Sequence, residues 1–369
     1  MTSWNLLHIN TERDWRGGEA QTLLLAQGLQ ARGHRCDLAA PGGSPLESRA
    51  REMGLEVLPF TSRGEFDLKA IRRLALILHA RSPSLIHYHT SHAITLGSLA
   101  SLRAGRRLAV ASRRVSFPLS RNPLARFKYT WRVDRVIAVS EAIRDALLEA
   151  GVRRERVVVI PSAVDLERLR ANADRASGRR DLGVAEEEFL VGAVGHLALH
   201  KGHAVLVEAA RRVAAKEPKV RFVLTGIGEQ EEDLRRRIEA AGLTAIFRLT
   251  GFRKEIAGIV SALDALAFPS LSGEGSPAVL KEAMACGVAI VASDIHGVRE
   301  IVRPGREGLL VPPKDPEALA DALLRLARDR ELRVECARRG RERSLEFSVA
   351  RLVDRTEALY RDLLEAGRR

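Results

Sequence analysis

Short apolar runs alternate with amphipathic segments along almost the whole chain. Residues 6–9 predict a first strand, and apolar positions at helical spacing over 19–32 predict a helix that ends near Gly33. Further strands are expected over 36–40, 55–60, 85–89, 108–111, 136–139 and 157–160, with helical patterns between most of them. Strands and helices that alternate in this way indicate a parallel sheet covered by helices on both faces.

Residues 165–188 interrupt this alternation with a charged segment that is poor in strand formers. Beyond it, strands are expected over 189–194, 220–224, 246–249, 265–268 and 288–292, and helices over 202–216, 316–330, 332–343 and 347–366. We therefore predict an α/β protein with two Rossmann-like domains that face each other across a cleft. Their expected bounds are 1–168 (N-terminal domain), 169–187 (linker), 188–346 (C-terminal domain) and 347–369, a C-terminal helix packing back on the N-terminal domain.

Length and composition agree with this division. A chain of 369 residues exceeds one ordinary core, which favours two domains. The N-terminal residues lack a signal-peptide pattern, and no run approaches the roughly 18 apolar residues that span a bilayer. Three widely spaced cysteines fit neither a zinc site nor a disulfide framework. These features predict a cytoplasmic protein.

The formal net charge of +13 suggests an anionic partner. Between Arg103 and Arg135 there are ten basic residues and one acidic residue, Asp134. The stretch is either a solvated surface of a basic protein or a surface that meets an anion. Together with Trp15, it leads us to expect peripheral contact with an anionic membrane leaflet.

The segment 268–287 carries the densest chemistry. A buried strand ends near Pro269 and a Gly/Ser-rich loop follows, with Ser276 as the expected N-cap of a helix that ends before Gly287. A loop that feeds a helix N-terminus presents free backbone N–H groups to a phosphate. Glu274 in the loop and Glu282 two turns into the helix can accept hydrogen bonds from vicinal sugar hydroxyls. The combination favours a nucleotide-sugar site over two solvent-facing glutamates.

This segment resembles the Glu-x7-Glu motif of the family 4 retaining glycosyltransferases (glycosyltransferase group 1), which have the GT-B fold. The resemblance extends over nearly the whole chain. It includes an N-terminal Gly-Gly loop at 16–19, a Pro-x-x-Val-Asp junction at 161–165, the segments 195–203 and 224–228, and a closing segment at 290–300. The ordered set is far more specific than any one of its glycine pairs.

The resemblance implies roles for individual residues. Glu282 is expected to hold the ribose, Glu274 the donor sugar, and Lys201 the leaving diphosphate, so that a nucleotide-diphosphate sugar is the co-substrate and neither a metal nor another cofactor is required. Fixed donors of this kind lower the barrier to breaking the glycosidic phosphate bond. The remaining residues with an implied donor-binding role are Gly17, Gly18, Gly226, Phe252, Gly275, Ser276, Pro277, Ala278 and Val279.

Two departures from the family pattern concern the catalytic helper. His196 stands where relatives carry an arginine, and a neutral imidazole gives one donor in place of a fork. Either His196 is protonated beside the diphosphate, or another base takes over, for which Arg113 and Arg114 after the predicted strand are candidates. The active-site histidine that many relatives carry near residues 112–115 is missing here. His89 and His92 are alternative acceptor-side or helper residues, or they line the cleft without chemistry.

The predicted function is transfer, with retention, of a sugar to a glycan or lipid-linked acceptor in cell-envelope polysaccharide, lipopolysaccharide or glycolipid synthesis. A nucleotide-sugar 2-epimerase of the same fold is the alternative. Nucleic-acid binding rests on charge alone and no reading motif supports it, so no nucleic-acid partner is expected. A nicotinamide dehydrogenase is disfavoured because no Gly-x-Gly-x-x-Gly opens the first helix.

Overall fold

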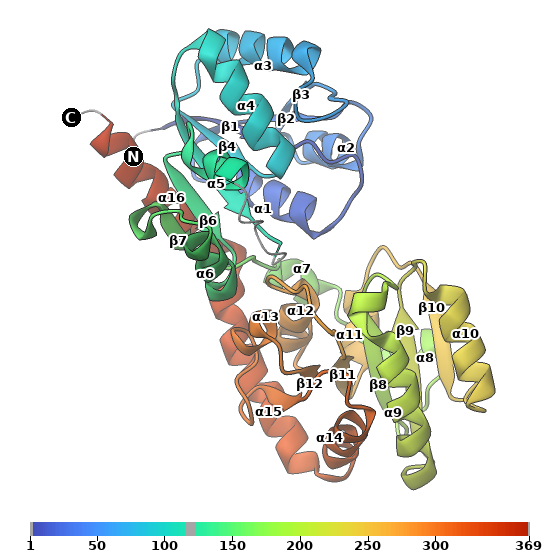
Figure 1. Ribbon diagram of the computed structural model, residues 1–369. Coiled ribbons are helices and arrows are strands. Elements are labelled where there is room, and N and C mark those ends of the chain that lie inside the picture. Colours follow the sequence, from blue (N-terminus) through green and yellow to red (C-terminus); the bar gives the residue numbers. More distant parts are fainter. Residues whose placement is uncertain (1–2, 116–122, 368–369) are drawn as a thin grey trace. The chain divides into compact units, whose positions relative to one another are not determined.

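The computed structural model describes residues 3–115 and 123–367, which form two compact units (Figure 1). The first unit comprises Met1–Ala163 and Val349–Arg369, and the second comprises Val164–Ser348. Part of the basic stretch, including Arg121, lies outside the described residues.

The first unit is a parallel sheet with strand order β3-β2-β1-β4-β5-β6-β7. Its strands are β1 (Asn5–Ile9), β2 (Arg35–Ala40), β3 (Glu56–Pro59), β4 (Leu85–Tyr88), β5 (Leu108–Arg113), β6 (Arg135–Ala138) and β7 (Val157–Val159). Its helices are α1 (Gly17–Ala31), α2 (Pro45–Glu52), α3 (Leu68–Arg81), α4 (Ser91–Ala104), α5 (Pro123–Thr130), α6 (Glu141–Glu149), η1 (Arg154–Arg156) and α16 (Val349–Ala366).

Alternating side chains place a separate apolar cluster on each face of this sheet. On β1, Leu7 and Ile9 belong to the cluster under α3 and α4, whereas Leu6 belongs to the cluster under α1 and α16. The C-terminal helix α16 contacts α1, and the Arg32 guanidinium donates to Glu357 on α16 over 2.6 Å. The C-terminal segment is thus part of the first unit, although the second unit precedes it in the sequence.

The second unit is a parallel sheet with strand order β10-β9-β8-β11-β12-β13. Its strands are β8 (Phe189–Val194), β9 (Val220–Thr225), β10 (Phe247–Gly251), β11 (Ala265–Phe268), β12 (Ala289–Ser293) and β13 (Gly308–Val311). Its helices are α7 (Leu166–Ala171), α8 (Arg175–Leu182), η2 (Leu199–Lys201), α9 (His203–Lys216), α10 (Glu231–Ala240), α11 (Ala257–Ala262), α12 (Ala278–Cys286), α13 (His296–Arg299), α14 (Pro316–Arg328), α15 (Arg330–Ser344) and η3 (Leu345–Phe347).

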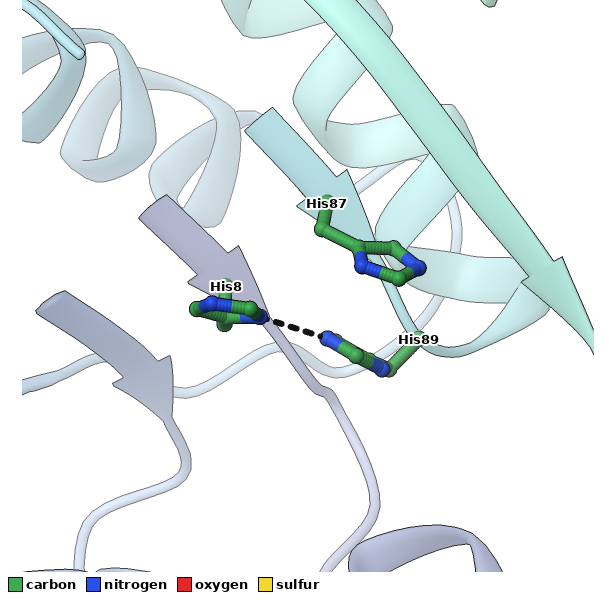
Figure 2. A group of neighbouring side chains, drawn as sticks. All are labelled: His8, His87 and His89. Carbon is green, nitrogen blue, oxygen red and sulfur yellow. Dashed lines mark hydrogen bonds between the residues drawn. The ribbon is translucent and has the colours of Figure 1, made fainter. Parts of the chain in front are cut away.

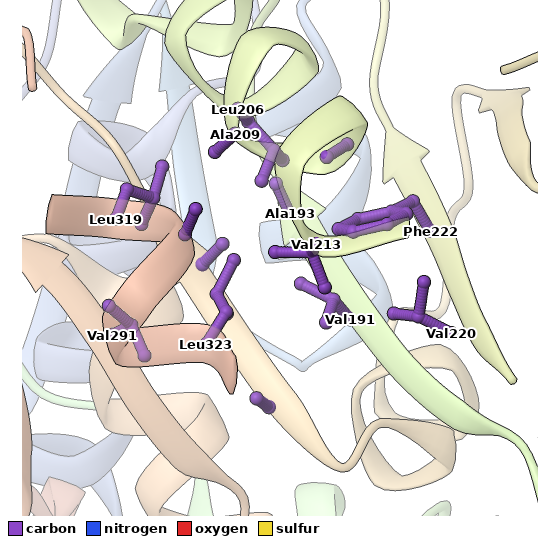
Figure 3. Close-up of a cluster of buried hydrophobic side chains, with 14 of the residues drawn as sticks. Val191, Ala193, Leu206, Ala209, Val213, Val220, Phe222, Val291, Leu319 and Leu323 are labelled. Carbon is purple, nitrogen blue, oxygen red and sulfur yellow. The ribbon is translucent and has the colours of Figure 1, made fainter. Parts of the chain in front are cut away.

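The largest apolar cluster of the second unit among the described residues lies where α9 and α14 cover one face of the sheet (Figure 3). Val191 and Ala193 point from β8 toward Leu206 on α9 and Leu323 on α14. Burial of each valine or leucine side chain here contributes roughly 1.5–3 kcal/mol. This packing fixes the central strands, and therefore also the loops at their carboxyl ends.

Residues 169–187 differ from the expected linker because they fold into the second unit. The segment includes α8, which packs on α11. Arg179 on α8 is almost fully buried, and its guanidinium donates to the backbone oxygens of Ala262 (3.0 Å) and Glu188 (2.6 Å). This buried arginine and the packing of α8 on α11 fasten the segment to the second unit, although most of its other charged side chains are exposed.

Candidate functional site

In the second unit, the loops after β8 and β11 meet at the carboxyl edge of the sheet. Gly202 has a φ of +66°, and a Cβ at this position would lie 2.1 Å from the backbone oxygen of Pro269. Glycine therefore allows the turn after Lys201 to contact the end of β11 directly. The Leu271 N–H also donates to the His200 oxygen over 2.8 Å, which fastens η2 to the loop after β11.

This contact brings Lys201 and Glu274 together, 73 positions apart in the chain. The Lys201 ammonium donates to Glu274 Oε1 over 2.6 Å, and the Ser270 hydroxyl donates to the same oxygen over 2.7 Å. The Glu274 carboxyl is buried, whereas the Lys201 side chain is 22% exposed. One carboxylate oxygen thus fixes a cation at the edge of the sheet, where an anionic ligand can reach it.

Helix α12 begins at Ala278, with Pro277 in the N-cap position. The expected cap by Ser276 is wrong, because its hydroxyl accepts a hydrogen bond from the Lys281 ammonium over 2.6 Å. In the described part of the chain no side chain caps this helix, so its first-turn N–H groups can donate to a ligand. The expected helix end is confirmed, since Gly287 adopts the left-handed conformation at φ +69°.

Glu282 and its neighbour Lys281 are ionisable groups in an apolar setting. Burial raises the pKa of the Glu282 carboxyl to about 7, an effect that the Lys281 ammonium partly offsets. Burial also lowers the pKa of Lys281 to about 7, and its Nζ lies 4.9 Å from the centre of the Phe347 ring. Perturbed pKa values of this size are more frequent at functional sites than elsewhere. Lys281 was not expected from the sequence, because a lysine within a helix usually faces solvent.

The other expected donor-side residues lie on neighbouring loops of the second unit. A Cβ at Gly226 would lie 1.8 Å from the Gly195 oxygen, so the turns after β8 and β9 can only be adjacent with glycine there. His196, next to Gly195, is exposed, and its Nε2 lies 3.2 Å from a Glu229 carboxylate oxygen. Phe252 follows β10 with 66% of its surface exposed. Gly275 lies in the loop between Glu274 and α12.

In the first unit, Gly17 and Gly18 form the first turn of α1 and not a loop before it, a correction to the expected Gly-Gly loop. The cause is a capping interaction, in which Glu19 Oε2 accepts a hydrogen bond from the Arg16 N–H over 2.9 Å. The space where a Cβ would stand is open at both glycines. Their backbone therefore remains approachable.

Three buried histidines lie at the carboxyl ends of β1 and β4 (Figure 2). His8 Nδ1 is 2.9 Å from His89 Nε2, and the rings of His87 and His89 stack with centroids 4.1 Å apart. His87 is held by the Tyr360 hydroxyl at 2.5 Å and the Ser112 hydroxyl at 2.8 Å. Ligand atoms of the three rings lie within 4.8 Å of one another, a spacing that a metal ion could use. His8, His87 and Tyr360 were not among the expected site residues.

Desolvation keeps these histidines neutral. It lowers the pKa of His8 to about 3, with a smaller contribution from the Arg114 charge. It also lowers the pKa values of His87 and His89 well below 6.5, again aided by Arg114. Arg114 donates from Nη1 to the His89 backbone oxygen and from Nη2 to His89 Nδ1, both over 3.0 Å.

Arg113 and His92 do not join this cluster. Arg113 is buried and donates to the Tyr129 hydroxyl over 3.0 Å. His92 lies in the first turn of α4, half exposed, with Nε2 3.6 Å from a Glu65 oxygen. Of the four expected helper residues, the structure therefore brings together only His89 and Arg114.

Comparison with known structures identifies the fold. The crystal structure of Anabaena HepE with UDP aligns with a TM-score of 0.87 at 23% identity, covering 97% of this chain and all of that one. The HepE complex with UDP-glucose aligns at 0.84 with 26% identity over 96% of this chain and 99% of that one. A Rickettsia africae glycosyltransferase aligns at 0.88 with 18% identity over 99% of both chains. The two parallel-sheet units are those of a GT-B glycosyltransferase.

Two family models match this chain, one in its N-terminal part and one in its C-terminal part. "Glycosyltransferase Family 4" matches residues 15–168 and "Glycosyl transferases group 1" matches residues 174–343. The chain therefore belongs to the family 4 glycosyltransferases (glycosyltransferase group 1), as its motifs indicated.

Individual relatives differ in substrate. The phosphatidyl-myo-inositol mannosyltransferase of Mycobacterium leprae is 28% identical over 95% of this chain and 94% of its own length. The UDP-Gal:alpha-D-GlcNAc-diphosphoundecaprenol alpha-1,3-galactosyltransferase of Escherichia coli is 26% identical over 81% of this chain and 80% of its own. The match to the D-inositol 3-phosphate glycosyltransferase of Corynebacterium jeikeium, at 29% identity, covers 63% of this chain and 58% of that relative.

Proposed function

We propose that this protein transfers a sugar, with retention, from a nucleotide-diphosphate sugar to a lipid-linked or glycan acceptor of the cell envelope, without a metal ion. The observation that carries the proposal is the Lys201–Glu274 contact beside the uncapped N-terminus of α12. A cation and free N–H groups together suit a leaving diphosphate. Glu282 and Glu274 are then the acceptors for ribose and donor-sugar hydroxyls.

The relatives support the substrate classes. HepE has been crystallised with UDP and with UDP-glucose, which favours a nucleotide-sugar donor. Two relatives are named for acceptors that carry phosphate on a lipid, a phosphatidyl-inositol and a diphosphoundecaprenol sugar. We therefore expect an acceptor that carries phosphate, as in glycolipid or lipopolysaccharide synthesis.

Transfer from a panel of nucleotide sugars to phosphorylated lipid acceptors tests the proposal. Lys201→Met and Glu274→Gln are expected to lower kcat/KM by about 100-fold or more, in line with losses when one charge-stabilising donor is removed. Lys216→Met is the matched control, because this lysine on α9 is exposed and pairs with Asp321 at 4.0 Å. Full activity in both site variants would refute the assignment. Donor epimerisation without acceptor would favour the 2-epimerase alternative.

We also propose that the first unit lies peripherally on the cytoplasmic, anionic face of a membrane. No helix among the described residues is long and apolar enough to cross a bilayer. Leu102 and Phe127 are 54% and 51% exposed, and each adjoins an exposed arginine, Arg103 or Arg126. Exposed apolar groups beside cations favour binding at an anionic interface.

Sedimentation with anionic and with neutral vesicles tests this membrane contact. Leu102→Asp is expected to weaken binding to anionic vesicles, whereas Leu345→Asp, an exposed leucine of the second unit, leaves it unchanged. An absence of binding to anionic vesicles at low salt would end this proposal.

A further inference from the structure

We propose that His89 and His8 are positioning residues that hold the Arg114 guanidinium as a fork for a substrate oxyanion at the carboxyl end of β5. The inference rests on the proposed function, whose donor and acceptor both supply phosphate groups. Arginine presents five N–H donors in a rigid plane, a geometry that matches phosphate oxygens. The residues that orient the guanidinium plane therefore determine whether it can donate to a substrate oxyanion.

Both contacts of the fork are to one residue. Arg114 Nη1 donates to the His89 backbone oxygen and Nη2 donates to His89 Nδ1, each over 3.0 Å. The backbone contact alone would leave the guanidinium free to turn about it. The ring contact is the second point that fixes the plane, and it requires a lone pair on Nδ1.

The protonation state of His89 follows from this contact. Arginine has donors only, so Nδ1 must accept and the ring proton must lie on Nε2. That Nε2–H then donates to His8 Nδ1 over 2.9 Å, which places the His8 proton on its own Nε2 (Figure 2). The chain of donors therefore runs in one direction, from Arg114 through His89 to His8.

The last donor of this chain, the His8 Nε2–H, has no acceptor in the part of the protein that the structure describes. His8 Nε2 is buried and has no hydrogen-bond partner among the described residues. An unpaired buried donor is rare and costs stability. The lowered pKa values of His8 and His89 agree with the neutral rings that this direction of donation requires. In this arrangement His89 Nδ1 carries no proton, so this atom can only accept a hydrogen bond from Arg114.

His87 supports the ring from its face. It stacks on His89 at 4.1 Å and is itself fixed by Tyr360 and Ser112. The neighbouring Arg113 instead meets Tyr129, so the proposal concerns Arg114 alone.

The same geometry disfavours a metal at these histidines. A metal on His89 Nε2 would need the lone pair there, while Nδ1 already accepts from Arg114. The ring would then have to lose its last proton, or Arg114 would have to leave. Metal binding and the Arg114 contact are therefore competing uses of the same ring.

A double-mutant cycle tests the positioning role. Arg114→Ala and His89→Leu are each expected to lower kcat/KM by about 10- to 100-fold, and the double variant is expected to be no worse than Arg114→Ala, because His89 acts through Arg114. His89→Gln should restore most of the activity, since its amide can accept from Arg114 and donate to His8. Multiplicative losses in the double variant, or a His89→Gln variant as poor as His89→Leu, would overturn the proposal.

The kinetic parameters locate the oxyanion. A raised KM for the acceptor in Arg114→Ala and His89→Leu assigns it to the acceptor phosphate, and a raised KM for the donor assigns it to the diphosphate. A loss in kcat with both KM values unchanged contradicts an anion-binding fork. His34→Leu is the control for removing a buried histidine of the same unit, and should lower stability with both KM values unchanged.

A measurement without substrate separates this inference from the proposed function. In protein labelled with ¹⁵N-histidine, we expect His89 and His8 to show protonated Nε2 and unprotonated Nδ1. Addition of Zn²⁺ should leave these signals unchanged. A protonated Nδ1 on His89, or zinc bound stoichiometrically to the wild type and lost in His8→Leu, would overturn the positioning role even if transfer activity is found. Absence of transfer with the expected ring protons would refute the proposed function only.

Discussion

Replacement of Glu282 by glutamine is expected to stabilise the second unit at pH 8 while weakening the donor site. The pKa of this carboxyl is raised from 4.5 to about 7 by burial. The unfolded chain therefore releases the proton near pH 4.5, whereas the folded chain retains it to about pH 7. The stabilising contribution of the protonated form is fully present below pH 4.5 and is lost as the pH rises to 7. Glutamine stays neutral and avoids this loss.

The size of the effect follows from the shift. Each pKa unit corresponds to about 1.4 kcal/mol, so the full shift is worth roughly 3 kcal/mol. Because Glu282 is only partly buried, we reduce this to about 1–2 kcal/mol after solvent screening. For a unit of this size that is about 3–6 °C in Tm. The neighbouring Lys281 does not cancel it, since its own pKa near 7 makes it largely neutral at pH 8.

The assay is thermal unfolding of wild type and Glu282→Gln at pH 5 and pH 8, with α12 followed by hydrogen exchange. The advantage of the variant should be small at pH 5 and grow at pH 8. Glu335→Gln is the control of opposite sign, because Arg338 and Arg339 lower the pKa of that exposed carboxyl to about 2. If the Tm difference between Glu282→Gln and wild type is the same at both pH values, the assigned burial of the charge is wrong.

Three further predictions concern the metal, a backbone contact and the C-terminal helix. Transfer should persist in excess EDTA, because Lys201 and the α12 N-terminus supply the positive charge; loss of activity that Mg²⁺ or Mn²⁺ restores would contradict this. Gly226→Ala should destabilise the second unit by about 2 kcal/mol or more in urea unfolding, since its Cβ would meet the Gly195 oxygen, whereas Gly258→Ala should be neutral; equal effects would refute the contact. Tyr360→Phe should cost about 1 kcal/mol of unfolding free energy by removing the His87 hydrogen bond, and an unchanged urea midpoint would show that this bond contributes nothing.

The sequence predicted the elements well where hydrophobic periodicity decides them. The expected strands at 189–194 and 265–268 coincide with β8 and β11, and most others differ by one or two residues. Strand β13 (Gly308–Val311) was missed, because a four-residue run between charged loops has little periodicity. The segment over 169–187 was misjudged because α8 packs on α11 and buries Arg179, a tertiary arrangement that composition does not reveal.

The donor-side residues were predictable because their motif is local. Glu274, the helix start and Glu282 lie within nine positions, and Lys201 directly precedes Gly202, the glycine of its own turn. The N-cap of α12 was the exception, because whether the Ser276 hydroxyl can cap this helix depends on the position of the Lys281 ammonium, which donates to it. That lysine is drawn inward by Phe347, at the other end of the unit's sequence.

The histidine cluster depends on strand register and could not be predicted from spacing alone. A polar residue in the apolar run of β1 was the available signal, but the pairing of His8 with His87 across β1 and β4 follows only from the sheet. This register places the His8 and His87 imidazoles side by side on one face of the sheet. His89, just after β4, stacks on both rings. Arg114 and the strand histidines are thus one structural feature, because Arg114 contacts His89, which in turn contacts His8. Arg114→His, with His8 and His89 unaltered, is therefore expected to lower kcat/KM as Arg114→Ala does, since a neutral imidazole has neither the reach nor the two donors that the Arg114 contacts use; wild-type kcat/KM in this variant would contradict the role of the fork.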